Sequence, residues 1–139
     1  MVEDTGKVED LLEANRIVLA DLETEIEGMV DAESRCEGPV RIGPGATVER
    51  SRLRGPLVIG AGAHISDAYV GPFTAIADGV VLDHCEIEHS IVLERSRITG
   101  VPRRIESSLI GRDAVVTASD AMPRAHRLML GDSSRVELS

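Results

Sequence analysis

Histidine side chains are the first candidates for chemistry in this sequence. His84 and His89 lie five residues apart, and His64 lies twenty residues before His84. Imidazole nitrogen suits zinc, and an imidazole can also act as a general base. Two adjacent arginines, Arg103 and Arg104, follow on the carboxyl side and could face a phosphate group of a ligand. What these residues can do depends on the elements that position them.

Those elements follow from a repeat of seventeen residues. An unbroken series of aliphatic residues has this spacing: Ile42, Ile59, Ile76, Leu93 and Ile110. Other columns keep the same step, namely Gly45, Gly62 and Gly79; Val48, Ile65 and Leu82; and Leu53, Val70 and Ile87. A short period of this kind indicates a solenoid, in which each repeat buries its face only against the next. Three inward aliphatic residues per unit predict a triangular coil with three short strands per turn.

The turns of this coil have their own chemistry. Each corner must turn the chain sharply within two residues, which needs backbone angles open mainly to Gly, Asn or Asp, and the glycine column supplies them. Between Ile98 and Ile105 the inner spacing lengthens to seven residues. One residue is therefore expected to bulge outward there, as the single irregularity of the coil.

A structural interpretation competes with the catalytic interpretation of His84. Arg50, Asp67 and His84 occupy one column of the repeat, on turns separated by about 4.8 Å, the usual spacing of paired strands. This column predicts an outward ladder of charges in which Asp67 lies between two cations.

The sequence divides into three segments. Residues 1–30 form a linker and a helix, with an apolar stripe at helical spacing from Val8 to Glu27 and Gly28 as the expected stop. Residues 31–120 form the coil, and we expect residues 121–139 to be a tail with a last strand around 135–138. The helix is expected to cover apolar surface at or beside the amino end of the coil, and the tail to shield part of the other end.

Composition limits the partners. The formal net charge of −9 argues against binding to nucleic acid or to an anionic membrane surface. The acidic start and the lack of an apolar run behind it argue against a signal peptide, and no stretch approaches the roughly 20 apolar residues of a membrane span. Cys36 and Cys85 fall in different columns, so we expect two separate reduced thiols in a cytoplasmic protein.

The repeat resembles the left-handed parallel β-helix of the hexapeptide-repeat superfamily, and the left hand of the expected coil is implied by that resemblance. A closer resemblance covers essentially the whole chain. Four segments look like the β-helical carboxy-terminal region of long glucose-1-phosphate thymidylyltransferases: residues 4–15, 87–94, 108–112 and 130–138. The resemblance implies an enzyme that couples dTTP and glucose 1-phosphate into dTDP-glucose and pyrophosphate.

The resemblance also implies a division of labour. The family's nucleotide-binding half begins with a glycine-rich phosphate loop, which this sequence does not contain. Asp4 matches a family aspartate that helps to hold magnesium on the nucleotide phosphates, a role that needs a second carboxylate from that half. This chain is therefore expected to hold no cofactor and to serve assembly and spacing, not catalysis by itself. Relatives are commonly trimers, so we expect a homotrimer first and a dimer second.

Two other relatives suggest chemistry for the histidines. Carbonic anhydrases of the hexapeptide-repeat type bind zinc through three histidines, two of them five apart, although the Arg-x-Asp pair expected before the first histidine is missing here. Other members are acetyltransferases that use coenzyme A. That alternative would act on a sugar or sugar nucleotide, with His84 or His89 as the base and Arg103 or Arg104 at a phosphate of coenzyme A. It stays open as the runner-up.

Overall fold

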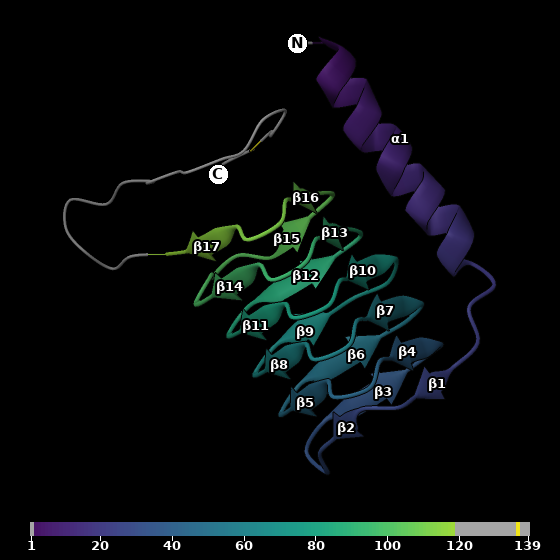
Figure 1. Ribbon diagram of the computed structural model, residues 1–139, viewed down its shortest axis with the longest axis vertical. Coiled ribbons are helices and arrows are strands. Elements are labelled where there is room, and N and C mark those ends of the chain that lie inside the picture. The colour runs from purple at the N-terminus through teal and green to yellow at the C-terminus, as the bar shows by residue number, and fades with distance from the viewer. Residues whose placement is uncertain (1, 119–135, 137–139) are drawn as a thin grey trace.

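The computed structural model describes residues 2–118 and Val136, with side chains from Gly6 onward. One helix, α1 (Val2–Leu19), is followed by short parallel strands that wind into a three-sided coil (Figure 1). The expected fold class, a parallel β-solenoid preceded by a helix, is confirmed. The strand expected around 135–138 lies outside the described residues, except for Val136.

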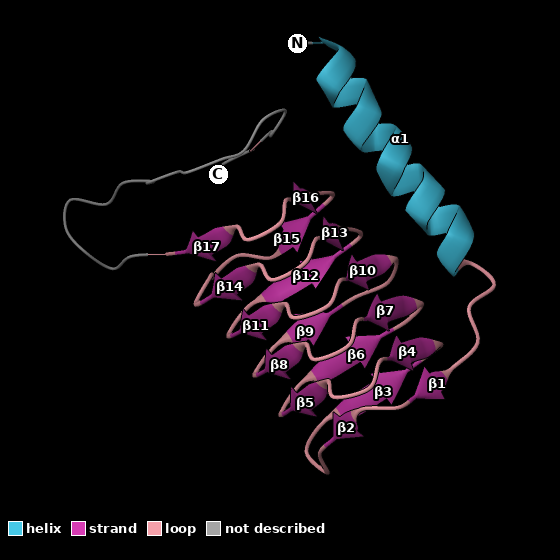
Figure 2. Ribbon diagram, in the orientation of Figure 1, coloured by secondary structure: helices cyan, strands magenta, loops and turns pink. Residues whose placement is uncertain are grey.

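Three parallel sheets form the sides of the coil (Figure 2). Sheet A contains β1 (Glu25–Ile26), β4 (Val40–Ile42), β7 (Leu57–Ile59), β10 (Thr74–Ile76), β13 (Ile91–Val92) and β16 (Leu109–Ile110). Sheet B contains β2 (Met29–Val30), β5 (Thr47–Glu49), β8 (His64–Ser66), β11 (Val81–Asp83), β14 (Arg97–Thr99) and β17 (Val115–Thr117). Sheet C contains β3 (Arg35–Glu37), β6 (Arg52–Arg54), β9 (Tyr69–Val70), β12 (Glu86–Glu88) and β15 (Ile105–Glu106).

Each sheet stacks one residue per turn in a column that faces the interior, and all of these residues except Cys36 are aliphatic. In sheet A the register stacks Ile26, Ile42, Ile59, Ile76, Val92 and Ile110. The sheet B column is Val30, Val48, Ile65, Leu82, Ile98 and Val116, and the sheet C column is Cys36, Leu53, Val70, Ile87 and Ile105. The central members of all three columns are 0–1% exposed. Stacked aliphatic side chains thus replace the aromatic core that the composition cannot supply.

One member of the predicted column was wrong. Val92, not Leu93, pairs with Ile76 on one side and Ile110 on the other, and Leu93 lies partly exposed next to it. The step from Ile76 to Val92 is sixteen residues and the next step is eighteen, so the sum over two turns is unchanged. An aliphatic residue at both positions 92 and 93 made the shift invisible in the sequence.

The structure shows where the residues were lost and gained. The corner between β12 and β13 is one residue shorter than the equivalent corners, since Ile87 and Val92 are five apart where Val70 and Ile76 are six apart. The loop between β14 and β15 is then two residues longer than the equivalent corners, not one as expected. The corner between β15 and β16 is again one residue shorter, since Ile105 and Ile110 are five apart, so these three irregularities cancel over the turn.

The corners use left-handed backbone angles, as expected. Gly45, Gly62 and Gly79 have φ values of +77°, +68° and +71°. The corner between sheets B and C differs, because Arg50 and His84 adopt φ values of +47° and +50°, which are uncommon for residues with a side chain. Their backbone N–H groups donate hydrogen bonds to the preceding turn, which helps to hold this conformation.

The helix is shorter at its carboxyl end than predicted. It ends at Leu19, and residues 25–26 and 29–30 are already strands of the first turn of the coil. Ile26 pairs with Ile42 and Val30 with Val48. Beyond Leu19, inter-strand hydrogen bonds and side-chain stacking thus stabilise strands more than the apolar stripe stabilises a continued helix. Ile26 lies sixteen residues before Ile42, and Val30 lies eighteen residues before Val48. The seventeen-residue spacing therefore does not reveal this first turn.

The helix packs against the middle of the coil. Leu12 and Leu19 are 5% and 3% exposed, and the Asn15 side-chain amide donates a 3.1 Å hydrogen bond to the carbonyl oxygen of Phe73 at the start of β10. The Arg16 guanidinium lies 4.7 Å from the centroid of the Phe73 ring. The expected cover over the amino end is therefore wrong, and Ile26 and Met29 at that end are 47% and 74% exposed.

The corrected register predicts an unequal pair of substitutions. Val92→Ala should lower the free energy of unfolding by about 2 kcal/mol, because it removes two methyl groups from a fully buried column. Leu93→Ala should cost less although it removes more atoms, since Leu93 is partly exposed. Ile76→Ala, with a cost of about 2–5 kcal/mol, sets the scale for a buried position. Urea denaturation measures all three, and a larger loss for Leu93→Ala than for Val92→Ala would contradict the register.

Candidate functional site

The corner between sheets B and C carries the predicted ladder of charges. The Arg50 guanidinium donates two 3.0 Å hydrogen bonds to the two carboxylate oxygens of Asp67. The His84 Nε2 atom lies 4.0 Å from Asp67 Oδ2 on the other side. The predicted outward ladder, with Asp67 between Arg50 and His84, is confirmed. Its geometry follows from the seventeen-residue step, which repeats the same outward corner position on three successive turns.

Hydrogen bonds lower the pKa values of two carboxyl groups, Asp67 in the ladder and Asp83 beside it. The Arg50 guanidinium lowers the pKa of the Asp67 carboxyl below its ordinary value, through its hydrogen bonds first and its charge second. A hydrogen bond from the Ser66 hydroxyl, with a further one from His84, lowers the pKa of Asp83. Both carboxylates are thus held in their charged form at neutral pH.

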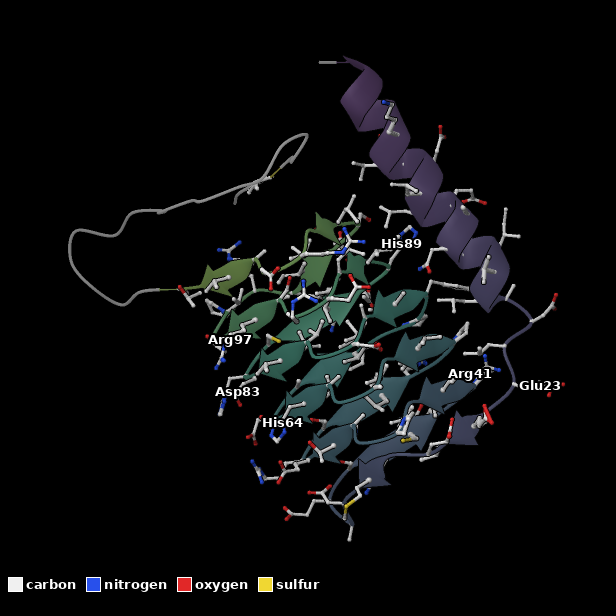
Figure 3. The ribbon with its side chains drawn as sticks, viewed as in Figure 1. Glu23, Arg41, His64, Asp83, His89 and Arg97 are labelled. Atoms are coloured by element: carbon white, nitrogen blue, oxygen red, sulfur yellow. The ribbon has the colours of Figure 1, made fainter. Side chains whose placement is uncertain are left out.

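The histidines do not form one site within a chain. His84 is exposed at the B–C corner, whereas His89 lies at the next corner, beyond β12. His64 projects from β8, where its Nε2 atom is 3.1 Å from Glu49 Oε1. Figure 3 shows His64 and Asp83 along one side of the coil and His89 at the side nearer α1. A three-histidine zinc site within one chain is therefore not assembled by these residues.

His89 is the more enclosed of the two candidate bases. Its Nδ1 atom is 3.4 Å from the Ser107 hydroxyl, and its Nε2 atom is buried with no hydrogen-bond partner among the described residues. Its backbone is also in the left-handed region, with φ +48°. A general base must reach a substrate proton, and the buried Nε2 atom offers no such access in this conformation.

The candidate arginines are engaged in the chain's own contacts. Arg104 bonds to Glu86 at 3.0 Å, lies 3.4 Å from Glu88 and stacks 4.8 Å from the centroid of the Tyr69 ring. Arg103 also makes contacts within the protein. Both carboxylate partners of Arg104 lie on β12, and the carboxylate of Asp113 pairs instead with Arg95 at 2.8 Å. The structure therefore shows Arg104 in a role that stabilises sheet C.

Two further predicted positions have different outcomes. Asp4 lies on α1, and its side chain is outside the described part of the structure. Cys36 and Cys85 are unpaired thiols, as expected. Burial raises the pKa of the Cys85 thiol to about 11, so at neutral pH it is an unreactive member of the core.

A cluster of possible metal ligands surrounds His84. One ligand atom from each of Asp67, Asp83 and His84 lies within 4.8 Å of the others. Asp67 already has both carboxylate oxygens on Arg50, and Asp83 accepts hydrogen bonds from Ser66 and His84. The ligand atoms are thus already used within the ladder, which is their structural role.

A shallow groove runs beside the ladder over the outer face of sheet C. It has a volume of about 620 Å³ and extends from Glu33 in the first turn to Val101 and Pro102 in the long loop. Arg35 and Arg52 lie along it, and they form no ion pair with any described residue. Analysis of the sequence missed these two arginines, although their seventeen-residue spacing and outward parity could have identified them.

The architecture and the outward ladder define the class as a three-sided parallel β-solenoid. No protein-family profile matches the chain. It is 54% identical over 135 residues to glucose-1-phosphate thymidylyltransferase of Streptomyces antibioticus and 50% identical over 136 residues to that of Streptomyces griseus. These matches cover 97% and 98% of the chain. The expected resemblance is confirmed over nearly the whole chain.

The relatives are longer proteins. The chain spans 38% of the length of each of the two Streptomyces enzymes. A low-salt glycan biosynthesis nucleotidyltransferase of Haloferax volcanii is 40% identical over 138 residues, again with 38% of its length covered. A structure of a GDP-perosamine N-acetyltransferase variant from Caulobacter crescentus matches 70% of this chain and 52% of its own at 19% identity, with a TM-score of 0.29. That similarity is too low to support an argument about function.

Among the described residues, α1 is not apolar enough over its length to cross a membrane.

The ladder predicts an acid-shifted titration. By carboxyl NMR, Asp67 should titrate below 3.8, the ordinary value, and Arg50→Gln should raise its midpoint because the two hydrogen bonds are lost. The depressed pKa means that the stabilisation is present above about pH 3.8 and is lost as the pH falls through the lower, folded-state value. Arg97→Gln, which removes an equal charge from the outer face of β14, should leave the midpoint unchanged. An unchanged Asp67 midpoint in Arg50→Gln would disprove the assignment.

Proposed function

We propose that this chain is the carboxy-terminal β-helical part of a glucose-1-phosphate thymidylyltransferase-like enzyme. The enzyme couples dTTP and glucose 1-phosphate into dTDP-glucose and pyrophosphate. The β-helical part serves assembly and rigid spacing and does not catalyse the reaction by itself. The observation that carries the proposal is the 54% identity over 135 residues to a glucose-1-phosphate thymidylyltransferase.

The contacts of the described residues support a scaffolding role. Charged side chains of successive turns pair with one another along the coil, as in Arg50–Asp67, Arg95–Asp113 and Arg112–Glu94. Each turn also donates backbone hydrogen bonds to its neighbours through the parallel ladders. A rod built in this way keeps a fixed length and orientation, which suits a spacer between parts of an assembly.

Magnesium enters the proposal only through the longer enzyme. Mg²⁺ takes near-octahedral oxygen coordination, and Asp4 offers one carboxylate. The chain by itself therefore does not supply a magnesium site, and Asp4 would bind the ion only with carboxylates contributed by a nucleotide-binding half.

The acetyltransferase alternative has weaker support. It needs a histidine and an arginine at one cleft, with coenzyme A between them. Within one chain, His84 is exposed at one corner, His89 has a buried Nε2 atom at another, and Arg104 is held by Glu86 and Glu88. These positions would have to be brought together across two subunits.

Activity assays distinguish the catalytic role of the longer enzyme from the scaffolding role of this chain. A longer protein that contains this segment and an upstream glycine-rich loop should release pyrophosphate from dTTP and glucose 1-phosphate in the presence of magnesium. The present chain at the same concentration should release none, because it contains no phosphate loop. Turnover by this chain alone would contradict the scaffolding role, and an inactive but folded longer protein would contradict the assignment of the reaction.

Assembly is the second part of the proposal. We expect a homotrimer first and a dimer second, since apolar side chains remain on the surface. Leu11, Ile17 and Val18 on α1 are 49%, 64% and 74% exposed, and Val58, Ala75 and Ile91 line a second groove on the outer face of sheet A. Sedimentation velocity at micromolar concentration measures the state. A single monomeric species would refute the proposal.

A further inference from the structure

The outer face of sheet C carries an unusual pair of arginines. Arg35 on β3 and Arg52 on β6 are register partners on adjacent parallel strands, so their backbones are about 4.8 Å apart. Both are exposed, and neither has a carboxylate within ion-pair distance among the described residues. Five other arginines of the coil do have one, namely Arg41, Arg50, Arg95, Arg104 and Arg112, whereas Arg54 and Arg97 have none among the described residues. Two adjacent, unpaired cations repel each other, and an anion bound between them would relieve the repulsion.

The surface around this pair is hollow. Arg35 and Arg52 lie in the groove of about 620 Å³, with Tyr69 as the next residue of the same outward column. The Tyr69 ring is held in place by Arg104 and by a 3.3 Å hydrogen bond from its hydroxyl to Glu88. Val101 and Pro102 of the long loop line the far end. The groove therefore places a fixed ring and an apolar wall beyond the two guanidinium groups.

The charges of the groove favour an anion at one place. Asp67 is neutralised by Arg50 and Glu86 by Arg104. Asp67 first, and Glu33 last, raise the pKa of the Arg50 guanidinium, and Glu33 is the remaining carboxylate of the lining. Of the three arginines that line the groove, Arg50 is paired with Asp67, whereas Arg35 and Arg52 have no ion pair among the described residues. In a protein of net charge −9, a local pair of this kind marks a specific position and not a general attraction for anions.

The chemistry of arginine identifies the class of ligand. A guanidinium binds a phosphoryl group with two parallel N–H···O bonds, which a lysine cannot reproduce. Two guanidinium groups one strand spacing apart can each take one of two linked phosphoryl groups. We propose that the outer face of sheet C binds a diphosphate ester, with Arg35 and Arg52 on the two phosphoryl groups and the organic part directed toward Tyr69. This inference does not rest on the proposed function.

Binding of inorganic pyrophosphate tests the site directly. Isothermal titration of the whole chain at low ionic strength, with EDTA to exclude divalent cations, should show saturable binding. Arg35→Gln and Arg52→Gln should each weaken it at least about tenfold, the loss of one charge-assisted bidentate contact. The matched control is Arg97→Gln, an exposed arginine of β14 on another face. The control should bind like the parent, and circular dichroism should show the same fold for all four proteins.

Three results would overturn the proposal. No saturable binding by the parent chain would exclude the site, and an equal loss in Arg97→Gln would reduce it to a general charge effect. Orthophosphate binding as tightly as pyrophosphate would exclude the assignment to a diphosphate. Arg52→Lys should lose most of the affinity although it keeps the charge, because the fork geometry is lost. If Arg52→Gln changes the sedimentation coefficient while pyrophosphate does not bind, the pair belongs to a protein interface and the proposal fails. None of these outcomes depends on thymidylyltransferase turnover.

Discussion

The stacking of one aliphatic residue per strand onto the equivalent residue of the next turn is the interaction on which this structure depends. Each turn of the coil is too small to bury anything by itself, and its three inward side chains lose their water only when the neighbouring turns cover them. The parallel hydrogen-bond ladders set the distance between turns, and the interior columns set their rotation. All outward positions, including the charged corners and the groove, inherit their alignment from these columns.

Because the interior columns fix the alignment of the outward residues, the repeat of inward aliphatic residues decides how much of the fold and of the outer surface the sequence can predict. Ile42, Ile59 and Ile76 show the period directly, and the outward ladder of Arg50, Asp67 and His84 followed from the same step. The prediction failed where a second apolar residue stood next to the correct one, as with Val92 and Leu93. It also failed where a helical pattern continued into residues that pair as strands, as with Ile26. A sequence shows which residues are apolar, but only pairing decides between two neighbouring candidates.

The candidate site shows the same limit in another form. Spacing placed His84 at a corner correctly, but it could not show that the Nε2 atom of His89 is buried. It also could not show which carboxylate Arg104 would choose, because Glu86 and Glu88 come within reach only through the strand pairing of β12 with β15. The unpaired state of Arg35 and Arg52 is visible only when all possible partners have been located.

The attachment of α1 to the middle of the coil has a consequence for motion. Asn15 and Arg16 of α1 contact Phe73 at the fourth turn, while two exposed apolar residues, Ile26 and Met29, lie in the first turn. In a chain of turns that contact only their neighbours, opening begins at the ends and proceeds inward. Amide protons of β1 and β2 should therefore exchange with solvent before those of β10, while the fourth turn still holds the helix. Fraying of the end and undocking of the helix are thus separate events with separate free energies, and one can be altered without the other.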